Sequence, residues 1–239
     1  MTLEDSIASP DGKRRYVSGL FTTIAGRYDF ITRFLSFGRD RHWKERLIDR
    51  AGVVPGARVL DLACGTGDLA FLAASRGGVV VGLDLTTRMI ELAKAKPGAG
   101  AIRWLTGDMT ALPIVAGRFD LVTTGYGLRN VPDLSRALDE IDRVLTSGGQ
   151  LLSLDFNRPD AAWLRAIYLT YLTIVGSSLG WALHGDPDTY RYIPASIRRY
   201  PGARAVAEMM RAKGFVDVAW LPVLGGLMAI HRATRANEK

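Results

Sequence analysis

A glycine turn flanked by carboxylates is the part of this 239-residue chain best suited to chemistry. The turn spans residues 65–67 (Gly-Thr-Gly), with Asp61 before it and Asp68 after it. Glycines at a strand-to-helix turn adopt backbone angles forbidden to other residues and let a ligand approach the main chain. Asp84 lies seventeen residues after the last glycine, close to the spacing at which an acidic residue binds ribose hydroxyls. The pattern predicts a nucleotide site, although Asp84 could instead cap the helix expected from residue 86.

Two classes of nucleotide cofactor compete for this turn. Residues 65–70 satisfy the dinucleotide pattern G-x-G-x-x-A, which would indicate NAD. A pyrophosphate, however, favours an uncharged turn at a helix N-terminus, and carboxylates this close would repel it by about 1 kcal/mol or more. S-adenosylmethionine carries a sulfonium and an ammonium, which acidic residues attract. The D-x-A-C-G-x-G arrangement resembles the first motif of class I methyltransferases, and we favour that cofactor.

A second glycine-rich loop carries an arginine. It spans residues 125–131 (GYGLRNV) and follows an apolar run at 119–124. Parallel α/β sheets bind ligands at the carboxyl ends of their strands, so we expect this loop and the turn 65–67 to face one site. The guanidinium of Arg129 stays protonated in ordinary circumstances and is suited to stabilising an anion.

The elements that must position these loops read as alternating strands and helices. Short apolar runs predict strands at 59–62, 79–84, 101–105, 119–124, 150–156, 216–220 and 225–231. Helical spacing of apolar residues predicts helices at 69–74, 134–145 and 206–213. Together they resemble class I S-adenosylmethionine-dependent methyltransferases, an α/β, Rossmann-like fold whose seven-stranded, mostly parallel sheet has helices on both faces.

Two helical stretches lie outside that pattern. Residues 1–15 are polar and we expect them to be irregular, but from residue 17 apolar and aromatic residues recur at helical spacing. We predict a tail and helical cap over 1–50, then a cofactor-binding domain over 51–239 with a helical insert at about 160–200 after the fifth strand. Residues 166–183 are uncharged, at the lower limit for spanning a bilayer. Their glycines, serines and threonines favour a core or pocket-lining helix that touches the bilayer surface at most.

Composition narrows the partners. The net charge is +7 and the pI about 9.7, which fits nucleic acid, an anionic membrane surface or plain solubility. No run of like charges or basic-aromatic repeat supports nucleic acid. The one cysteine, Cys64, excludes an internal disulfide, and with three distant histidines it offers no metal cluster. The first residues lack an apolar signal segment, so we expect a cytoplasmic protein.

Over about residues 17–232 the chain resembles the UbiE/COQ5 family, the quinone-biosynthesis C-methyltransferases also called MenG. Residues 28–38 (YDFITRFLSFG), closed by Trp43, are similar to the family's Y-D-x-M-N and L-S signature. Ile31, Thr32 and Asp40 replace its methionine, asparagine and histidine.

Three later segments extend the resemblance. The loop 125–131 is close to S-F-G-L-R-N, with Gly and Tyr in the first two places, and residues 190–197 match Y-x-Y-L-x-x-S-I. Residues 143–149 are similar to R-V-L-K-P-G-G, and Asp155 stands where that signature ends in glutamate.

The resemblance implies C-methylation of a polyprenylated quinol in menaquinone or ubiquinone biosynthesis, of the demethylmenaquinol or 2-methoxy-6-polyprenyl-benzoquinol type. A tail that partitions into the bilayer implies peripheral membrane contact. A homo-oligomer or a biosynthetic complex is a further expectation. Two alternatives stay open, namely a methyltransferase for another hydrophobic small molecule and a non-catalytic module that binds S-adenosylmethionine or a lipid.

The same resemblance suggests residue roles. Those expected at the cofactor are Asp61, Gly65, Thr66, Gly67, Asp84, Asp108, Met109 and Gly125. Those expected at the substrate are Tyr28, Asn130 and Tyr190. Arg129 would be catalytic by stabilising the phenolate of the quinol, unless it only pairs with a carboxylate such as Asp155. His184 is an outside candidate for a base, and His231 we expect to be structural.

Overall fold

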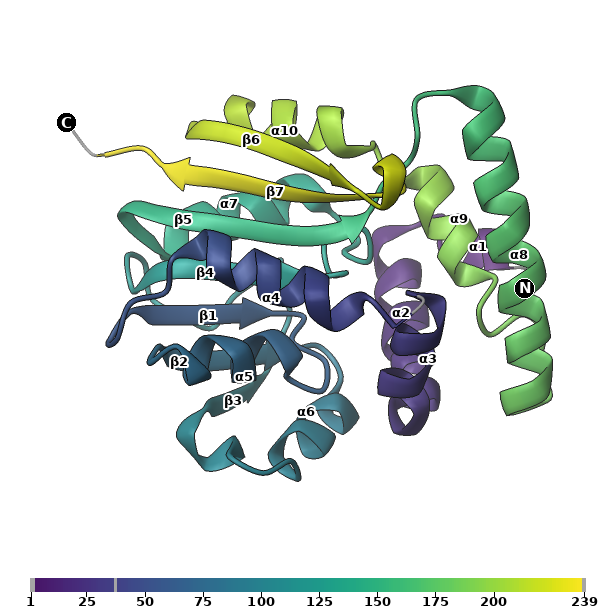
Figure 1. Ribbon diagram of the computed structural model, residues 1–239, viewed down its shortest axis with the longest axis horizontal. Helices are drawn as coiled ribbons and strands as arrows, with labels where there is room; N and C mark the ends of the chain where they lie inside the picture. The colour runs from purple at the N-terminus through teal and green to yellow at the C-terminus, as the bar shows by residue number, and fades with distance from the viewer. Residues whose placement is uncertain (1–2, 37, 238–239) are drawn as a thin grey trace.

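The protein is described from a computed structural model, which covers residues 3–36 and 38–237, so Phe37 of the 28–38 signature lies outside the described residues. One sheet of seven strands runs in the order β3-β2-β1-β4-β5-β7-β6 (Figure 1). The strands are β1 (Arg58–Leu62), β2 (Val79–Asp84), β3 (Arg103–Thr106), β4 (Phe119–Gly125), β5 (Leu145–Phe156), β6 (Phe215–Val223) and β7 (Met228–Arg235).

Strand pairing confirms the predicted mostly parallel sheet. β1 pairs in parallel with β2 on one side and β4 on the other, so Asp61 lies between Gly82 and Thr123. Among the strands of the described residues, β7 alone runs antiparallel to its neighbours, β5 and β6. The expected start of the last strand at residue 225 was wrong. Leu224–Gly226 forms a 3₁₀ turn, η3, because Gly225 has a φ of 64° that a strand cannot accommodate.

Helices cover both faces of the sheet, as predicted. On one face α4 (Asp40–Ala51) and α5 (Asp68–Ser75) pack on β1 through a cluster that includes Trp43, Leu47 and Leu69. On the other face α7 (Leu134–Val144) and α10 (Ala203–Ala212) bury Leu138, Ile141 and Met210. The remaining sheet helices are α6 (Thr87–Lys94) and the 3₁₀ turn η2 (Ala99–Ala101).

The other helices stand together at the carboxyl ends of the parallel strands (Figure 1). They are α1 (Leu3–Ser6), α2 (Pro10–Ile24), the 3₁₀ turn η1 (Ala25–Arg27), α3 (Tyr28–Leu35), α8 (Ala162–His184) and α9 (Tyr192–Arg199). Val17 of α2 packs against Tyr192 and Ala195 of α9, and Tyr190 packs with Ile24 and Ile31. The N-terminal cap and the insert therefore form one helical layer, whereas α4 belongs to the sheet.

The expectation of an irregular segment over 1–15 was wrong, because α2 begins at Pro10. The Ser9 hydroxyl caps this helix by accepting a hydrogen bond from the Gly12 N–H at 3.1 Å. A proline in the first turn and Asp11 near the positive end of the helix dipole both favour this start.

Candidate active site

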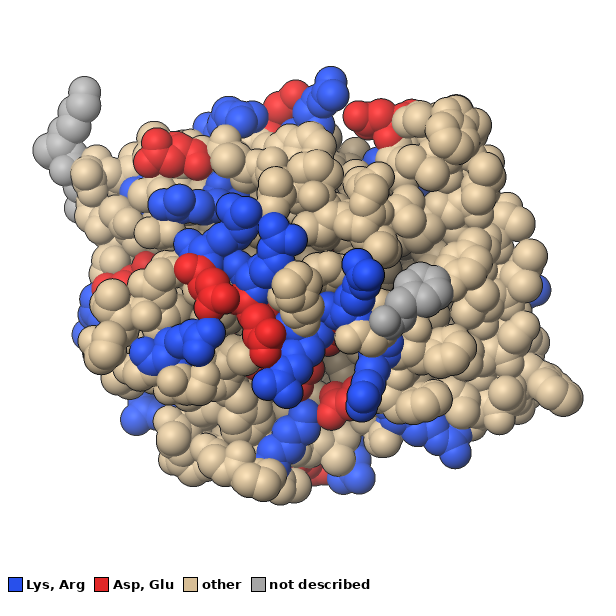
Figure 2. Space-filling model, viewed as in Figure 1, with Lys and Arg blue, Asp and Glu red and all other residues tan. Residues whose placement is uncertain are grey.

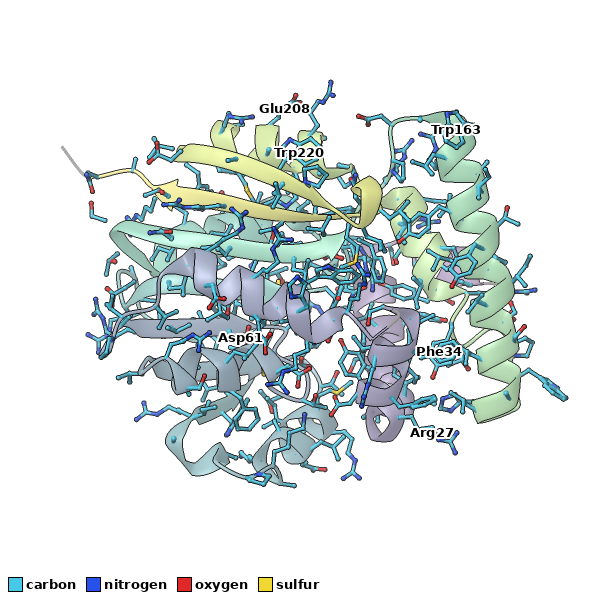
Figure 3. The ribbon with its side chains drawn as sticks, viewed as in Figure 1. Arg27, Phe34, Asp61, Trp163, Glu208 and Trp220 are labelled. Carbon is cyan, nitrogen blue, oxygen red and sulfur yellow. The ribbon has the colours of Figure 1, made fainter. Side chains whose placement is uncertain are left out.

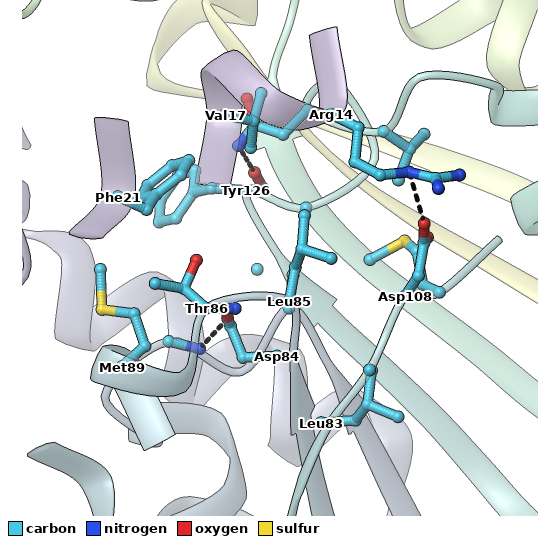
Figure 4. A pocket seen from close by; sticks show the side chains of 18 of the residues that line it. Arg14, Val17, Phe21, Leu83, Asp84, Leu85, Thr86, Met89, Asp108 and Tyr126 are labelled. Atoms are coloured by element: carbon cyan, nitrogen blue, oxygen red, sulfur yellow. Dashed lines mark hydrogen bonds and ion pairs between the residues drawn. The ribbon is translucent and has the colours of Figure 1, made fainter. Parts of the chain in front are cut away.

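Three cavities meet where the helical layer faces the strand ends. The nucleotide cavity, of about 660 Å³, lies over the turn after β1 and is lined by Gly65, Asp84, Leu85, Asp108 and Met109, among others (Figure 4). The apolar cavity, of about 1,080 Å³, lies between α2, α3 and α8. The acidic cavity, of about 290 Å³, is lined by Asp61, Thr66 and Asp68. Tyr28 and Tyr126 line all three.

Asp84 ties the glycine turn to the second strand. Its carboxylate accepts hydrogen bonds from the backbone N–H groups of Gly65 and Thr86, each at 2.8 Å. Burial raises the pKa of this carboxyl, and the two N–H groups oppose that shift. The helix-cap interpretation was wrong, because the N-cap of α6 is Thr86 and no side chain among the described residues caps this helix. Asp84 instead orders the residues before α6 and lines the nucleotide cavity, where its contact with the ribose stays a prediction (Figure 4).

Asp108 lies on the opposite wall of the nucleotide cavity (Figure 4). One of its oxygens accepts from the N–H of Thr110 at 2.8 Å and from its hydroxyl at 2.7 Å. The other pairs at 3.0 Å with the guanidinium of Arg14, which α2 brings across the cavity. The cofactor contact expected of Asp108 therefore competes with Arg14, a partner that the polar N-terminus did not suggest.

Asp61 is fully buried at the end of β1. One carboxylate oxygen accepts a hydrogen bond from the Thr123 hydroxyl at 2.9 Å, and the other has no hydrogen-bond partner among the described residues. Burial raises the pKa of Asp61 to about 7, against the opposing effects of the Thr123 hydroxyl and Lys44. A buried, unsatisfied carboxylate oxygen is costly and suits a cationic ligand.

Lys44 carries the opposite charge into the same acidic cavity. Its ammonium, buried on α4, pairs with Asp40 at 2.5 Å and with Asp68 at 2.8 Å. Burial alone would lower its pKa, but the carboxylates of Asp40 and Asp68 hold the pKa of Lys44 above its usual value. Asp40 also accepts a hydrogen bond from the Tyr126 hydroxyl at 2.6 Å. Two departures from the family signatures, Asp40 and Tyr126, are thus in direct contact.

Strained backbone marks the strand ends. Ala63, after β1, has a φ of 50°, and Tyr126, after β4, has a φ of 61°. Non-glycine residues in this region cost free energy and tend to gather at functional sites. Both residues line the nucleotide cavity.

The predicted turn residues divide between contact and support. Gly65 and Gly125 line the nucleotide cavity, and Thr66 lines the acidic cavity while its hydroxyl donates to Asp29. Gly67 lines none of the three cavities. A Cβ there would lie 2.6 Å from the Trp104 ring, and its φ is 93°, so its role is to make the turn.

The apolar cavity receives two of the three expected substrate residues, Tyr28 and Tyr190, whereas Asn130 lines the nucleotide cavity. Tyr190 also braces the helical layer, since it packs with Ile24 and its hydroxyl lies 2.9 Å from His184 Nε2. Tyr190 therefore both lines the apolar cavity and holds the helical layer together.

Arg129 lines the apolar cavity and is nearly fully buried. Its guanidinium pairs with Asp155 at 3.1 Å, donates to the Ser196 hydroxyl at 2.8 Å, and lies 5.0 Å from the centre of the Phe156 ring. The pairing with Asp155 is thus present, as the alternative interpretation expected, and the cavity contact is present as well.

His231 and His184 differ in their distance from the cavities, as the two hypotheses about them require. His231, in β7, lies 2.9 Å from the Ala203 carbonyl oxygen and 3.3 Å from the Ser153 hydroxyl, and lines none of the three cavities. Burial lowers its pKa. His184 reaches the apolar cavity only through Tyr190.

Comparison with known proteins decides the family. The model of the ubiE/COQ5 methyltransferase family matches residues 10–235. The chain belongs to this family. A demethylmenaquinone methyltransferase of Thermus thermophilus is 40% identical over 90% of this chain and 100% of its own. A ubiquinone/menaquinone biosynthesis C-methyltransferase UbiE of Methylobacterium nodulans is 39% identical over 92% and 91%.

Solved structures confirm the predicted class I fold of this ubiE/COQ5 family member. A S-adenosylmethionine-dependent methyltransferase from Thermotoga maritima, titled a possible histamine N-methyltransferase, has a TM-score of 0.67 at 19% identity, over 92% of this chain and 99% of its own. Phosphoethanolamine N-methyltransferase 2 of Haemonchus contortus, in complex with S-adenosyl-L-methionine, has a TM-score of 0.61 at 16% identity, over 82% and 53%. The family and fold together make the chain a S-adenosylmethionine-dependent methyltransferase.

The residues of this ubiE/COQ5 family member fit that cofactor. The unsatisfied oxygen of Asp61 would hold the ammonium of the methionine group, and Lys44 its carboxylate. Asp84 would bind the ribose, and the walls at Leu85 and Met109 would hold the adenine. The nucleotide cavity and the acidic cavity share Ala63 and Gly125 as well as Tyr28 and Tyr126. One extended ligand can therefore occupy both cavities.

Sequence reasoning missed the residues that reach the site from α2 and α4. Lys13 donates to the carbonyl oxygens of Arg129 at 2.9 Å and Val131 at 2.6 Å, and Arg14 pairs with Asp108. Lys44 lies in the charged stretch after Trp43. The capping pattern at Ser9-Pro10 was the available signal for α2, but no periodicity indicates which loop a lysine contacts.

Proposed function

We propose that this enzyme transfers the methyl group of S-adenosylmethionine to a ring carbon of a polyprenylated quinol. The observation that supports this acceptor most is an apolar cavity of about 1,080 Å³ that shares Tyr28 and Tyr126 with the cofactor site. One of the two relatives is named for demethylmenaquinone and the other for ubiquinone and menaquinone. A naphthoquinol is the acceptor common to those names, so we take it as the preferred ring.

The bound cofactor supplies an electrophilic methyl group on a sulfonium. An aromatic carbon attacks such a group well only after the neighbouring hydroxyl has lost its proton, when negative charge spreads onto the ring. Arg129 provides a fixed positive charge at the wall of the acceptor cavity, and Lys13 adds a second behind the same loop. Against the single carboxylate of Asp155, the two cations leave this wall positive and favour the phenolate.

Tyr28 and Tyr126 hold the reacting partners in line at the junction of the cavities. Burial raises the pKa of Tyr28 to about 12 and raises that of Tyr126 well above its usual value, so both stay neutral near pH 7. Neutral rings confine the acceptor without competing as nucleophiles, and positioning of this kind lowers the barrier of a two-substrate reaction.

The proton of the quinol needs an acceptor, and Tyr190 with His184 offers a route. The Tyr190 ring lines the acceptor cavity and its hydroxyl contacts His184 Nε2 at 2.9 Å. Burial lowers the pKa of His184, and the positive charge of Arg27 lowers it further. The imidazole is therefore neutral at pH 7 and able to accept a proton. Arg129 acts by its charge and not as the base, because a guanidinium stays protonated.

The acceptor class is tested by methyl transfer from labelled S-adenosylmethionine to a panel of quinols that differ in ring and tail. Prenylated naphthoquinols should give C-methylated products by mass spectrometry, at rates above those of matched benzoquinols. Transfer to a different hydrophobic acceptor with none to any quinol would replace the proposed substrate. Binding of the cofactor without transfer to any quinol would also contradict the proposed acceptor.

A substrate with a bilayer-soluble tail also bears on location. We extend the proposal to a cytoplasmic enzyme that meets the membrane peripherally, alone or as part of a biosynthetic assembly or homo-oligomer. The net charge of +7 supports contact with an anionic surface.

A further inference from the structure

The outer face of α8 exposes large apolar side chains along its whole length. Trp163, Ile167, Ile174 and Trp181 are 69%, 62%, 62% and 71% exposed, and Tyr171 lies between them. Their spacing of three, four or seven residues places them on one line of the helix. At 1.5 Å per residue this line is about 27 Å long. An exposed apolar stripe of this size, with a tryptophan at each end, indicates an interaction surface.

The stripe continues onto α3 across a groove. Phe30 and Phe34 are more than half exposed, and their rings stack with centres 6.2 Å apart. Figure 3 shows Phe34 on the side of α3 that faces α8. The groove, of about 960 Å³, is lined by Phe30, Arg33, Phe34, Gly38, Tyr171 and Val175. The apolar surface is therefore two helices wide, with a channel between them.

α8 has the length and composition of a membrane-spanning helix, but its inner face packs against the rest of the protein. Only 28% of the most apolar 18-residue stretch of α8 is buried in the protein. Yet Tyr168, Leu169 and Leu172 pack against Ile197 of α9, and a Cβ at Gly180 would lie 2.4 Å from the Asp186 carbonyl oxygen. A helix held along one face and apolar along the other fits a position in the plane of a bilayer surface.

Charge around this surface matches an anionic bilayer. Figure 2 shows the α8 side as a broad uncharged area with Lys and Arg at its border. Arg33 lines the groove. Burial lowers the pKa of His184, the last residue of α8, and the nearby positive charge of Arg27 lowers it further, which places Arg27 close to this end of the helix. Of the acidic residues at the two ends of α8, Asp160 pairs with Arg204 and Asp188 with Arg191. Asp186 accepts hydrogen bonds from the Asp188 N–H and the Thr189 hydroxyl.

The groove connects with the site. Tyr171 lines both the surface groove and the apolar cavity in which Arg129 lies. A chain-like apolar ligand could therefore run from the surface, past Tyr171, to the place where the cavities meet.

We propose that the outer faces of α8 and α3 dock this enzyme on an anionic lipid bilayer, and that the groove between Phe34 and Tyr171 is the portal for the tail of its acceptor. The docking surface stands on the exposed stripe and its basic border. The portal rests on the proposed function, because it needs an acceptor with a long apolar tail.

Docking is tested by flotation of the full chain with vesicles of phosphatidylcholine and phosphatidylglycerol. Replacing both isoleucines in the variant Ile167→Gln/Ile174→Gln should weaken vesicle binding at least about tenfold, since two apolar side chains leave the membrane interface. Arg33→Gln should weaken binding to the anionic vesicles about fivefold and leave binding to neutral vesicles unchanged. Because all three side chains are exposed, the melting temperatures should match that of the wild type.

The matched control is Val54→Gln. Val54 is 61% exposed but precedes β1, at the opposite end of the sheet from the helical layer, so vesicle binding should not change. Equal binding by the double variant and the wild type would overturn the docking surface. So would a wild type that ignores vesicles and uses the stripe to form a dimer by light scattering.

The portal is tested with two acceptors that share a ring but carry one or eight isoprene units. Val175→Trp, which narrows the groove, should lower the ratio of long-tail to short-tail rates about tenfold or more, whereas Ser178→Trp, one turn along the helix, should leave the ratio unchanged. An unchanged ratio in Val175→Trp would overturn the portal. If neither acceptor is methylated by the wild type, the proposed function fails, and the vesicle result still decides the docking surface.

Discussion

Asp61 shows how burial can prepare a residue for a charged ligand. The carboxyl sits between two strands with one oxygen unsatisfied, and burial raises its pKa to about 7. Between the ordinary value near 4 and this raised value the folded protein holds a proton that the unfolded chain has lost. The stability contributed by that proton is therefore lost as the pH rises from about 4 to about 7.

This predicts a pH dependence of cofactor binding. Only ionised Asp61 attracts the ammonium, so the affinity for S-adenosylmethionine should rise about tenfold between pH 6 and pH 8, with proton uptake by the buffer at low pH. Calorimetry in buffers of different ionisation enthalpy measures both effects. Asp61→Asn should bind weakly at every pH and melt at a higher temperature than the wild type at pH 8. A pH-independent affinity in the wild type would contradict the role of Asp61.

Arg129 predicts a loss of rate without a loss of cofactor affinity. Removing its charge should lower kcat by about 10²- to 10³-fold, as for other groups that stabilise a developing anion. Arg129→Ala alone would leave Asp155 buried and unpaired, which threatens folding. The informative comparison is therefore Arg129→Met/Asp155→Asn against Asp155→Asn. Equal rates in these two variants would show that the guanidinium has only a structural role.

Tyr190 and His184 predict a distinct effect on the proton step. Tyr190→Phe breaks the contact with His184 but keeps the ring that lines the cavity. The rate should fall most below pH 7, where hydroxide from solvent is scarce, with little change in the melting temperature. A uniform fall at all pH values, together with a lower melting temperature, would indicate that Tyr190 only braces the helices.

Among single residues, sequence reasoning found those that follow strands, and the family resemblance found Tyr28 of α3, but both missed the basic residues of α2 and α4. Asp61, Asp84 and Asp108 end or follow apolar runs, and the rule that strand ends gather at one edge brings them together. Lys13 and Lys44 have long side chains that contact residues more than twenty positions away in the sequence, Arg129 and Asp68. Their partners depend on how helices pack, which composition and spacing do not specify.

At the scale of elements, α2 forms one wall of the nucleotide cavity. Val17 and Phe21 line the nucleotide cavity, and two basic residues fasten the helix to it. Lys13 holds the carbonyl oxygens of the loop after β4, and Arg14 holds Asp108. Burial lowers the pKa of Lys13 to about 8, so this contact weakens as the pH rises through that value.

The fastening of α2 predicts how fast the cofactor product leaves. Lys13→Met/Arg14→Gln removes both contacts, so release of S-adenosylhomocysteine measured by stopped flow should accelerate about tenfold or more. Arg15→Gln, which changes an exposed arginine on the same helix, serves as the control. An unchanged release rate in the double variant would mean that α2 does not limit cofactor exchange.

Element prediction succeeded where hydrophobic periodicity is strong. The strands of the parallel half and the stripe of α7, with Leu138 and Ile141, follow from sequence. Two boundaries failed because backbone chemistry overrode composition. The N-cap Ser9 starts α2 inside a polar stretch, and Gly225 delays β7 until Met228.

For the whole molecule, one sheet carries the cofactor residues and one helical layer closes the acceptor side. The sheet is buried on both faces by separate clusters, which fixes the strand ends in space. The layer joins segments from residues 3–35 and 162–199, far apart in sequence, through Val17, Tyr190 and Tyr192. The chain suggested a cap and an insert, but their union around one apolar cavity depends on tertiary packing that periodicity does not reveal.

The measurement that tests this arrangement most directly is a crystal structure with S-adenosylhomocysteine and a prenylated naphthoquinol bound together. We expect the ammonium at Asp61, the ribose at Asp84, and the quinol ring between Tyr28 and Tyr126 with a hydroxyl beside Arg129. The reacting ring carbon should lie about 3–3.5 Å from the place of the transferred methyl group. A nucleotide bound away from the two aspartates, or a quinol ring outside the apolar cavity, would contradict the account.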